Sequence, residues 1–418
     1  MSDSQVNGLS IKANMLWNSV GSLTNLGCQW LITVLVARMA PNYESAGVYA
    51  LAMSIFNMFT QFAQYRMYTV QIADINKVRS VGEYLSFRLL TCGLALFALV
   101  VYSVCTCKPT ALPVIVLYAL YKMIGLVIDV LHACDQCNHR MDYIGKSLML
   151  QGVFSLGGFM LVFGFTGILE LAIACMALSA ALIGILYDFP KAKQLDIITL
   201  KFNVEDSIRQ LIQYAPIVIA GIAFAAAPNL PRQYISSSLG DSSLGVYASI
   251  AAPVAIIQMG ATYIYDPLLG YLVERFFKYQ KREFITLIVW VVLGIATVGI
   301  VCYAVLEFIG PRLLEIIYGP SICDYIYLLQ PMIVCAFTTG LSWFLNDLLV
   351  ALRMHQGVII GGVSCWGLTL CIIKPLIDFF GINGATLVNL LTSIFSISIM
   401  ASILTVSAAR WFSKELND

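Results

Sequence analysis

Long apolar runs alternate along the chain with short polar or charged breaks. Each run holds about 20 residues, the length that an α-helix needs to cross the hydrocarbon core of a bilayer. Cutting the sequence at the charged and the Pro- or Gly-rich breaks predicts twelve such helices, at residues 12–37, 45–65, 84–107, 111–132, 144–166, 168–187, 207–230, 243–268, 284–306, 325–350, 358–377 and 383–407. The pattern predicts an all-α integral membrane protein without a separate soluble domain.

A short sequence pattern occurs twice, near the second predicted helix of each half. Ser45-Ala46-Gly47-Val48-Tyr49-Ala50 recurs as Ser243-Leu244-Gly245-Val246-Tyr247-Ala248. Two halves of six helices share one orientation because six is even, which predicts a pseudo-twofold axis along the membrane normal and a substrate cavity between the halves. The predicted division is an N-terminal six-helix bundle at residues 1–188, a cytoplasmic linker at 189–206 and a C-terminal six-helix bundle at 207–418.

Composition supports the membrane assignment. Of 418 residues, 60% are hydrophobic and 11% are charged, whereas soluble domains carry about 25% charged residues. The balance of 24 Lys and Arg against 23 Asp and Glu lacks the basic footprint of a nucleic-acid-binding protein, so nucleic acid is excluded as a partner. Most of the Lys and Arg fall in one set of loops together with both termini, and this asymmetry predicts that both termini are cytoplasmic.

Ionisable residues inside the predicted spans are the first functional candidates. Lys122, Asp129 and His132 share the fourth predicted helix at offsets of seven and ten residues, which places them on one helix face. A charge at a helix centre costs about 2.5 to 3.5 kcal/mol on insertion scales. Lys122 either lines a cavity or belongs to a structural pair, and we favour the cavity. Coupling candidates are Asp129, His132, Asp266 and Asp347.

Amide side chains form stripes on the first two predicted helices. They recur at spacings of three and four residues, so each stripe occupies one helix face. Single amides in a membrane can be interhelical contacts worth about 0.6 to 2 kcal/mol, but whole stripes favour the wall of a wet cavity that binds a polyhydroxylated substrate. The candidate sugar-binding residues are Asn18, Asn25 and Gln29 on the first helix and Asn57, Gln61 and Gln64 on the second.

One motif suggests a metal site and is discounted. Cys134 and Cys137 form a CxxC between His132 and His139, but the spacing is too tight for a usual zinc site and there is no second CxxC. No P-loop, Gly-rich nucleotide loop or zincin motif occurs either. We therefore expect no metal, no cofactor and no enzyme activity, and transport driven by gradients.

Several segments together resemble one family. They are Ala37-Arg38-Met39, Gly47 to Ala52, Asp129-Val130-Leu131-His132 with Gln136, Arg140 to Gly145, Leu230-Pro231-Arg232-Gln233-Tyr234 with Leu244-Gly245-Val246-Tyr247, and Phe380 to Ala385. In their order along essentially the whole chain they resemble the bacterial polysaccharide transporters, the Wzx-type O-antigen or capsule repeat-unit flippases of the MOP superfamily. The collective order, rather than any single motif, carries this resemblance.

The resemblance implies a lipid-linked oligosaccharide as substrate, carried on polyprenyl pyrophosphate and moved by alternating access to the outer face of the bacterial cell membrane. It also implies a polysaccharide polymerase and glycosyltransferases as partners. From their positions, we assign the pyrophosphate to Lys122, Arg88, Arg66 and Arg232. Arg88 could instead extend to the cytoplasmic face.

Two other functions stay open. A multidrug/cation antiporter of the same superfamily would need acidic cavity residues, whereas the membrane-embedded charge here leans basic. A membrane-embedded polysaccharide polymerase or acyltransferase is the alternative from another class, and polymerases usually have a large external loop that this sequence lacks.

The seventh predicted helix contains Pro216 and is followed closely by Pro231, with Pro228 near its end. Proline interrupts the backbone hydrogen bonds of a helix, so this segment is predicted to bend.

Overall fold

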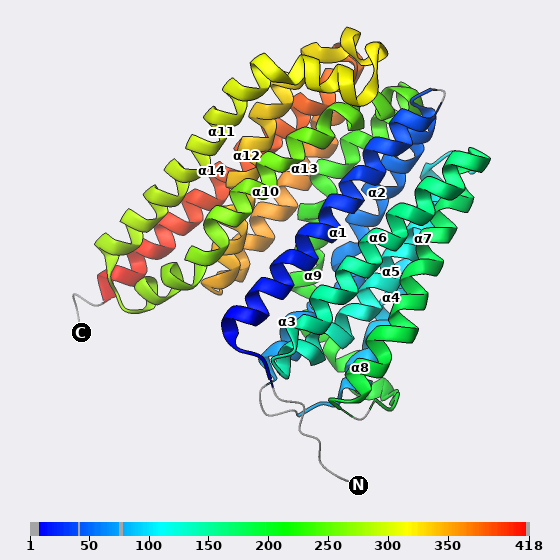
Figure 1. Cartoon of the computed structure of the whole chain (residues 1–418). Helices are drawn as coiled ribbons and strands as arrows, with labels where there is room; N and C mark the ends of the chain where they lie inside the picture. Colours follow the sequence, from blue (N-terminus) through cyan, green and yellow to red (C-terminus); the bar gives the residue numbers. More distant parts are fainter. Residues whose placement is uncertain (1–7, 41, 75–77, 197, 415–418) are drawn as a thin grey trace. The chain divides into compact units, whose positions relative to one another are not determined.

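The computed structural model describes residues 8–40, 42–74, 78–196 and 198–414. Within these ranges every regular element is a helix (Figure 1). Twelve helical segments in the same ranges are long and apolar enough to cross a membrane. The prediction of an all-α membrane protein with twelve spans is therefore confirmed.

The N-terminal half contains six spans, some of them built from more than one element. In two of these spans a short 3-10 or π-helical turn adjoins an α-helix. The elements are α1 (Ile11–Met39), α2 (Glu44–Gln64), α3 (Met67–Ala73), α4 (Val81–Thr106), η1 (Pro109–Ala111), α5 (Leu112–Cys137), α6 (Met141–Thr166), α7 (Leu169–Ile183), η2 (Gly184–Asp188) and α8 (Phe189–Lys193).

The C-terminal half has longer helices. Its elements are α9 (Val204–Ser238), α10 (Asp241–Phe277), α11 (Lys281–Tyr318), η3 (Pro320–Leu328), α12 (Leu329–Ala351), α13 (His355–Phe380) and α14 (Ile382–Lys414). With 37 and 38 residues, α10 and α11 exceed the roughly 20 residues that a bilayer requires. Helix α9 is continuous through its three prolines, so a bend there stays a prediction.

The chain forms two compact units. Unit 1 comprises Met1–Pro41 and Leu51–Val218, and unit 2 comprises Asn42–Ala50 and Ile219–Asp418. The first part of α9 belongs to unit 1, although the sequence-based division began the second bundle at residue 207. Side-chain contacts explain this difference: the Tyr65 hydroxyl donates to the Leu211 carbonyl at 2.7 Å, and Arg79 pairs with Asp206 at 3.3 Å.

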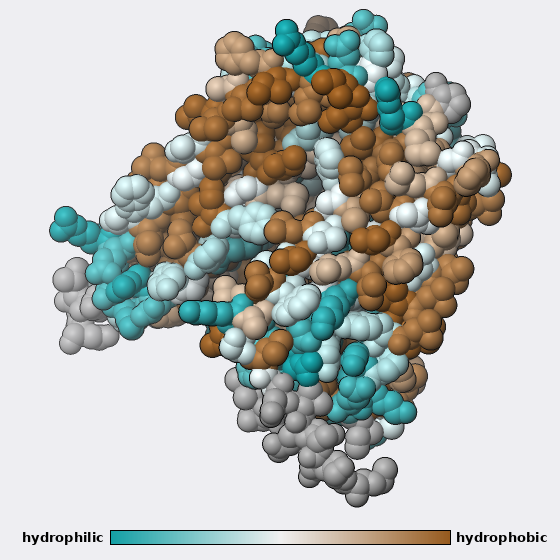
Figure 2. Space-filling model, viewed as in Figure 1, coloured by the Kyte–Doolittle hydropathy of each residue, from teal (hydrophilic) through white to brown (hydrophobic). Residues whose placement is uncertain are grey.

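The helix surfaces are suited to lipid. Phe97, Phe165, Phe308 and Phe379 are among many large apolar side chains that are exposed. Figure 2 shows hydrophobic side chains over much of the visible sides of the helices, with hydrophilic side chains gathered toward the helix ends. Water would disfavour such a surface, whereas the hydrocarbon core of a bilayer accommodates it.

In unit 1, α1 packs against α6 through small residues. A Cβ atom on Gly145 would overlap the carbonyl oxygen of Trp17, and a Cβ on Gly21 would overlap the Gly145 backbone. Further along α6, a Cβ on Gly152 would lie 3.0 Å from the Cα of Asn25. Small residues let helix backbones approach closely in a membrane. This close contact sets the rotation of α1 about its axis, and with it the direction in which the amide stripe faces.

Candidate functional site

Lys122 of α5 lies against the amide stripe of α1. Its Nζ donates to Gln29 Oε1 at 2.7 Å, and Gln29 Nε2 donates in turn to Asn25 Oδ1 at 3.3 Å. All three side chains are half-buried. Three residues that the sequence singled out on two separate helices are thus joined in one hydrogen-bonded chain within unit 1.

Aromatic rings complete the surroundings of the Lys122 ammonium group. Nζ lies 5.8 Å from the ring centroid of Tyr118 and 5.5 Å from that of Tyr121. Its direct contacts in the described part of the chain are therefore an amide oxygen and two ring faces, and Asp129 acts on it only at longer electrostatic range. Rings and amides hold a cation without neutralising it, so the charge of Lys122 can attract an anion.

Arg88 has a different place from the one expected. It is fully buried on α4, and its Nη1 donates to the carbonyl oxygens of Ala63 at 3.0 Å and Gln64 at 2.6 Å. These are orphan carbonyls at the end of α2, where the chain breaks before α3. The Arg88 guanidinium therefore stabilises this break, and its assignment to pyrophosphate stays a prediction that this conformation does not favour.

The break itself involves Arg66. Tyr65 and Arg66 both have left-handed backbone conformations, with φ of 46° and 56°, which is uncommon for residues other than glycine. Arg66 is half-buried and directly precedes α3. A strained two-residue break inside a membrane span needs partners for its freed backbone groups, and Arg88 supplies two of the bonds.

The rest of the amide stripes is only partly accounted for. Asn14 caps α6, because its Oδ1 accepts from the Met141 N–H at 2.9 Å, so its role is structural. Asn18 is half-buried on α1. On α2, Asn57 is exposed, whereas Gln61 and Gln64 are half-buried. The sugar-binding roles of these residues stay predictions.

In unit 2 the predicted residues form an acidic group on α10 and α12. Asp347 accepts from the Tyr265 hydroxyl at 2.8 Å and from Asn346 Nδ2 at 3.2 Å. Asp266, the neighbour of Tyr265 in sequence, is exposed, and Arg232 on α9 is half-buried. Two hydrogen bonds thus hold the Asp347 carboxylate, whereas the Asp266 side chain is exposed.

Asp129 and His132 lie further along α5 than Lys122. Asp129 is half-buried, and His132 is 3% exposed. His132 Nε2 lies 3.2 Å from Asp188 Oδ1. Along the helix face predicted for Lys122 and His132, Lys122 therefore contacts α1, whereas His132 contacts η2.

Sequence reasoning missed Asp188. It lies one residue beyond the sixth predicted helix, which ends at residue 187, and directly before the predicted linker at 189–206. In the structure the span continues to Lys193, and Asp188 is fully buried. The apolar residues that surround it, Tyr187 and Phe189, were the available signal.

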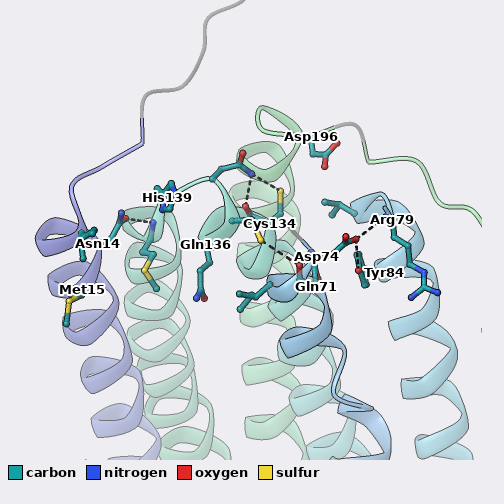
Figure 3. A pocket seen from close by; sticks show the side chains of 16 residues that line it. Asn14, Met15, Gln71, Asp74, Arg79, Tyr84, Cys134, Gln136, His139 and Asp196 are labelled. Carbon is teal, nitrogen blue, oxygen red and sulfur yellow. Dashed lines mark hydrogen bonds between the residues drawn. The ribbon is translucent and has the colours of Figure 1, made fainter. Parts of the chain in front are cut away.

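Unit 1 also contains a cavity of about 450 Å³, near the beginnings of α1 and α6. Asp74, Arg79 and Tyr84 lie together on one side of it, and Asn14 and His139 are among its other lining residues (Figure 3). Asp74 accepts from the Tyr84 hydroxyl at 3.0 Å and from the N–H groups of Val78 and Arg79, each at 3.0 Å. These bonds hold the wall of the cavity together.

The residues of the CxxC segment have other contacts. Within the described residues there is no group of three or more His, Cys, Asp or Glu side chains that could hold a metal ion. His132 contacts Asp188, and the Cys137 thiol lies 3.8 Å from the Gln71 carbonyl oxygen. The segment packs the end of α5 against its neighbours.

Comparisons with known proteins give matches by structure alone. No family model matches the sequence, and no curated protein matches it. The chain is similar in structure to the lipid II flippase MurJ in an inward closed conformation, with a TM-score of 0.74, 11% identity, and coverage of 96% of this chain and 89% of that one.

Two transporters of the MOP superfamily are also similar. An inward-facing multidrug resistance MATE family transporter has a TM-score of 0.64 and 12% identity, over 96% of both chains. A MOP superfamily transporter from Pyrococcus furiosus, described by a reverse polarity of its binding pocket, has a TM-score of 0.56 and 14% identity, over 93% of this chain and 94% of that one. The chain therefore has the twelve-helix fold of the MOP-superfamily transporters and flippases.

Proposed function

We propose that this protein is a flippase for a lipid-linked oligosaccharide. The observation that carries the proposal is Lys122, an ammonium group inside a membrane span whose described contacts are an amide and two aromatic rings. An intramembrane cation with no carboxylate in direct contact is costly, and an anionic substrate would reduce that cost. The lipid II flippase among the similar structures supports a substrate with a lipid tail.

The chemistry of the substrate matches the surroundings of Lys122. Moving a pyrophosphate through bare hydrocarbon would cost tens of kcal/mol by Born solvation. Lys122 would bind the pyrophosphate, and the linked amides of Gln29 and Asn25 would hydrogen-bond sugar hydroxyls beside it. Asn18, Asn57, Gln61 and Gln64 would extend this sugar-binding surface. Arg66 and Arg232 stay secondary candidates for the phosphates.

The membrane potential can drive the return of the empty carrier. A bound anion neutralises Lys122, so the potential acts mainly on the unloaded, positive site. One charge that crosses the full field gains about 2.3 kcal/mol per 100 mV. This energy would bias the return step toward a negative interior, and an ion gradient could add to it.

A cation antiporter is the second candidate, because unit 2 carries Asp266 and Asp347 on neighbouring helices. An acidic pair would suit a cationic substrate, and a MATE multidrug transporter is among the similar structures. Tyr265 and Asn346 already hold Asp347, whereas Asp266 is exposed. The polymerase or acyltransferase alternative gains no support, since the similar structures are transporters or flippases.

Flipping by reconstituted full-length protein tests the proposal. Vesicles would carry a lipid-linked oligosaccharide whose sugars become accessible to an external lectin after flipping. Lys122→Gln keeps much of the side-chain length but removes the charge, and we expect flipping to fall by about tenfold or more, which corresponds to ~1.4 kcal/mol. Lys122→Arg should retain more activity.

Lys374→Gln is the matched control, because Lys374 is an exposed lysine near the end of α13. Normal flipping by Lys122→Gln protein that is folded and inserted would overturn the role of Lys122. Export of a cationic dye by the wild-type protein, blocked by Asp266→Asn and not by Lys122→Gln, would instead favour the antiporter.

The direction of transport depends on orientation. We propose a bacterial cell membrane with both termini cytoplasmic, on the basis of the Lys and Arg asymmetry. A reporter fused after Lys108, between α4 and α5, should then lie outside, and one fused after Asp196 should lie inside. The opposite result at both positions would reverse the proposed direction. Polymerase and glycosyltransferase partners follow only if the substrate is a polysaccharide repeat unit.

A further inference from the structure

A buried polar cluster joins three spans of unit 1 beyond the Lys122 site. Asp188 of η2 is fully buried, and its two carboxylate oxygens have different partners. Oδ1 lies 3.2 Å from His132 Nε2 on α5, and Oδ2 accepts from the Ser147 hydroxyl of α6 at 2.8 Å. Gln151 Nε2 donates to Ser147 Oγ at 2.9 Å and extends the cluster along α6.

A second carboxylate lies beside this cluster without a partner. Asp135 follows His132 by three residues on α5, so the two side chains are neighbours on one helix face. Asp135 is fully buried, and neither of its carboxylate oxygens has a hydrogen-bond partner within the described residues. It lies within electrostatic range of both His132 and Asp188. A buried ionised group without a partner is among the most costly features of a protein interior.

The backbone near Asp188 departs from a regular helix. Residues Gly184–Asp188 form a π turn between α7 and α8, and Pro190 begins the next turn. Proline has no N–H to donate to the preceding turn, which accounts for an irregularity here. A π turn accommodates one extra residue and rotates the side chains that follow, and such turns are frequent at functional sites.

Arg140 lies within electrostatic range of Asp135 but is shared with another carboxylate. Arg140, at the start of α6, is held by Asp142 through two bonds, of 2.8 and 3.0 Å. Lys146 on α6 pairs with the same Asp142 at 3.5 Å. Further groups of the described chain in electrostatic range of the cluster are acids or phenols. They are Asp129 on α5, Asp142 on α6, Tyr187 on η2 and Tyr68 on α3.

We propose that His132, Asp188 and Asp135 form a proton-binding site buried between the spans of unit 1. With a neutral imidazole and two carboxylates, the site carries two negative charges. One proton that forms an N–H bond on His132 leaves one charge, and a second that forms an O–H bond on Asp135 leaves none. Both protons come from water and return to it, so no other bond changes.

A proton suits this site better than a metal cation. Hard cations take about six or more oxygen ligands, whereas both oxygens of Asp188 are already used by His132 and Ser147. A proton needs only one acceptor atom and removes the charge of Asp135 without a further partner. The role of the site in coupling rests on the proposed transport function, but proton binding itself does not.

Proton uptake by the purified full-length protein in lipid nanodiscs tests the inference without any substrate. Lowering the pH from about 8 to about 5, across the range in which a histidine and a buried carboxyl group titrate, should produce an infrared band of a protonated carboxyl group. Asp135→Asn should abolish this band, and His132→Gln should bind about one proton fewer in a dye assay. Glu170→Gln, in the first turn of α7, is the control and should match the wild type.

Two results on the wild-type protein keep the test independent of variant folding. Absence of a protonated carboxyl band at low pH would overturn the site, and so would release of the bound protons on addition of Na⁺. Proton binding with no effect of a pH gradient on flipping would leave the site in place and refute only its coupling role. Loss of flipping in Lys122→Gln with unchanged proton uptake would separate the two sites.

Discussion

Gly47 of α2 and Gly245 of α10 lie at one helix crossing and face each other's helix in the same way. A Cβ atom on Gly47 would overlap the carbonyl oxygen of Asp241, four residues before Gly245, and a Cβ on Gly245 would overlap that of Tyr43, four residues before Gly47. Both segments belong to unit 2. The repeated pattern of the sequence therefore marks a contact in which the two copies pack on each other backbone to backbone.

Alanine at either glycine should destabilise the protein. The added methyl group forces the helices apart, and overpacking of this kind costs about 1 to 3 kcal/mol. Thermal unfolding of the purified Gly47→Ala and Gly245→Ala proteins should show this destabilisation as lower unfolding temperatures than that of the wild type. Gly157→Ala on α6 is the control, because a Cβ there meets open space, and its stability should stay equal or rise slightly. Unchanged unfolding of all three variants would refute the close crossing.

Replacing Arg88 should affect folding before it affects substrate binding. Arg88→Gln leaves the buried carbonyls of Ala63 and Gln64 without their charged donor, and hydrogen bonds to charged groups are worth about 1.5 to 3 kcal/mol each. We expect a marked drop in unfolding temperature with Arg88→Gln and a smaller one with Arg88→Lys. Arg38→Gln, at an exposed position of α1, is the control. Normal stability together with weaker substrate binding would restore Arg88 as a pyrophosphate ligand.

A carboxylate at position 29 should neutralise Lys122 without removing it. Gln29 Oε1 accepts from Lys122 Nζ at 2.7 Å, so Gln29→Glu places an acid in ion-pair distance with almost no change of shape. Flipping should fall by about tenfold, ~1.4 kcal/mol, as the pair competes with pyrophosphate. The unfolding temperature should not decrease. Gln29→Leu, which breaks the bond but leaves the cation, should flip better than Gln29→Glu, and the reverse order would contradict an anionic substrate at Lys122.

Asp74 should make the cavity end of unit 1 sensitive to acid. Burial raises its pKa, but hydrogen bonds from the N–H groups of Val78 and Arg79 and from the Tyr84 hydroxyl, with the Arg79 charge, bring the pKa below the ordinary value of 3.8. A folded-state pKa below the unfolded one means that the carboxylate stabilises the fold above about pH 4, and that this contribution is lost as pH falls through the lower, folded-state value.

Thermal unfolding of wild-type and Asp74→Asn protein as a function of pH measures this contribution. The wild type should be the more stable at neutral pH, and the difference should shrink below about pH 4 as Asp74 is protonated. Glu44→Gln, an exposed change in the first turn of α2, should leave the pH profile unchanged. A difference that stays constant from neutral pH to acid would rule out an ionised Asp74 as its cause.

The lengths of the apolar runs and the polar breaks between them were enough to predict the twelve spans. Each span must place about 20 apolar residues in hydrocarbon and satisfy its own backbone hydrogen bonds, and both requirements are local. The amide stripe with Asn25 and Gln29 was equally visible, because its spacing follows the helix period. The sequence also marked Lys122, because a lysine inside an apolar span is costly and is expected to have either a structural partner or a function.

Tertiary structure decided which of these polar groups meet. Arg88 and Lys122 look alike in sequence, yet one binds the carbonyls of a helix break and the other lies among amides and rings. Asp188 lies at the boundary between the sixth predicted helix and the linker, and only the π turn and the packing of α5 and α6 bury it beside His132. A span's length and polarity are set by its own residues, whereas the partner of a buried charge depends on how neighbouring helices are placed and rotated, which no local pattern records.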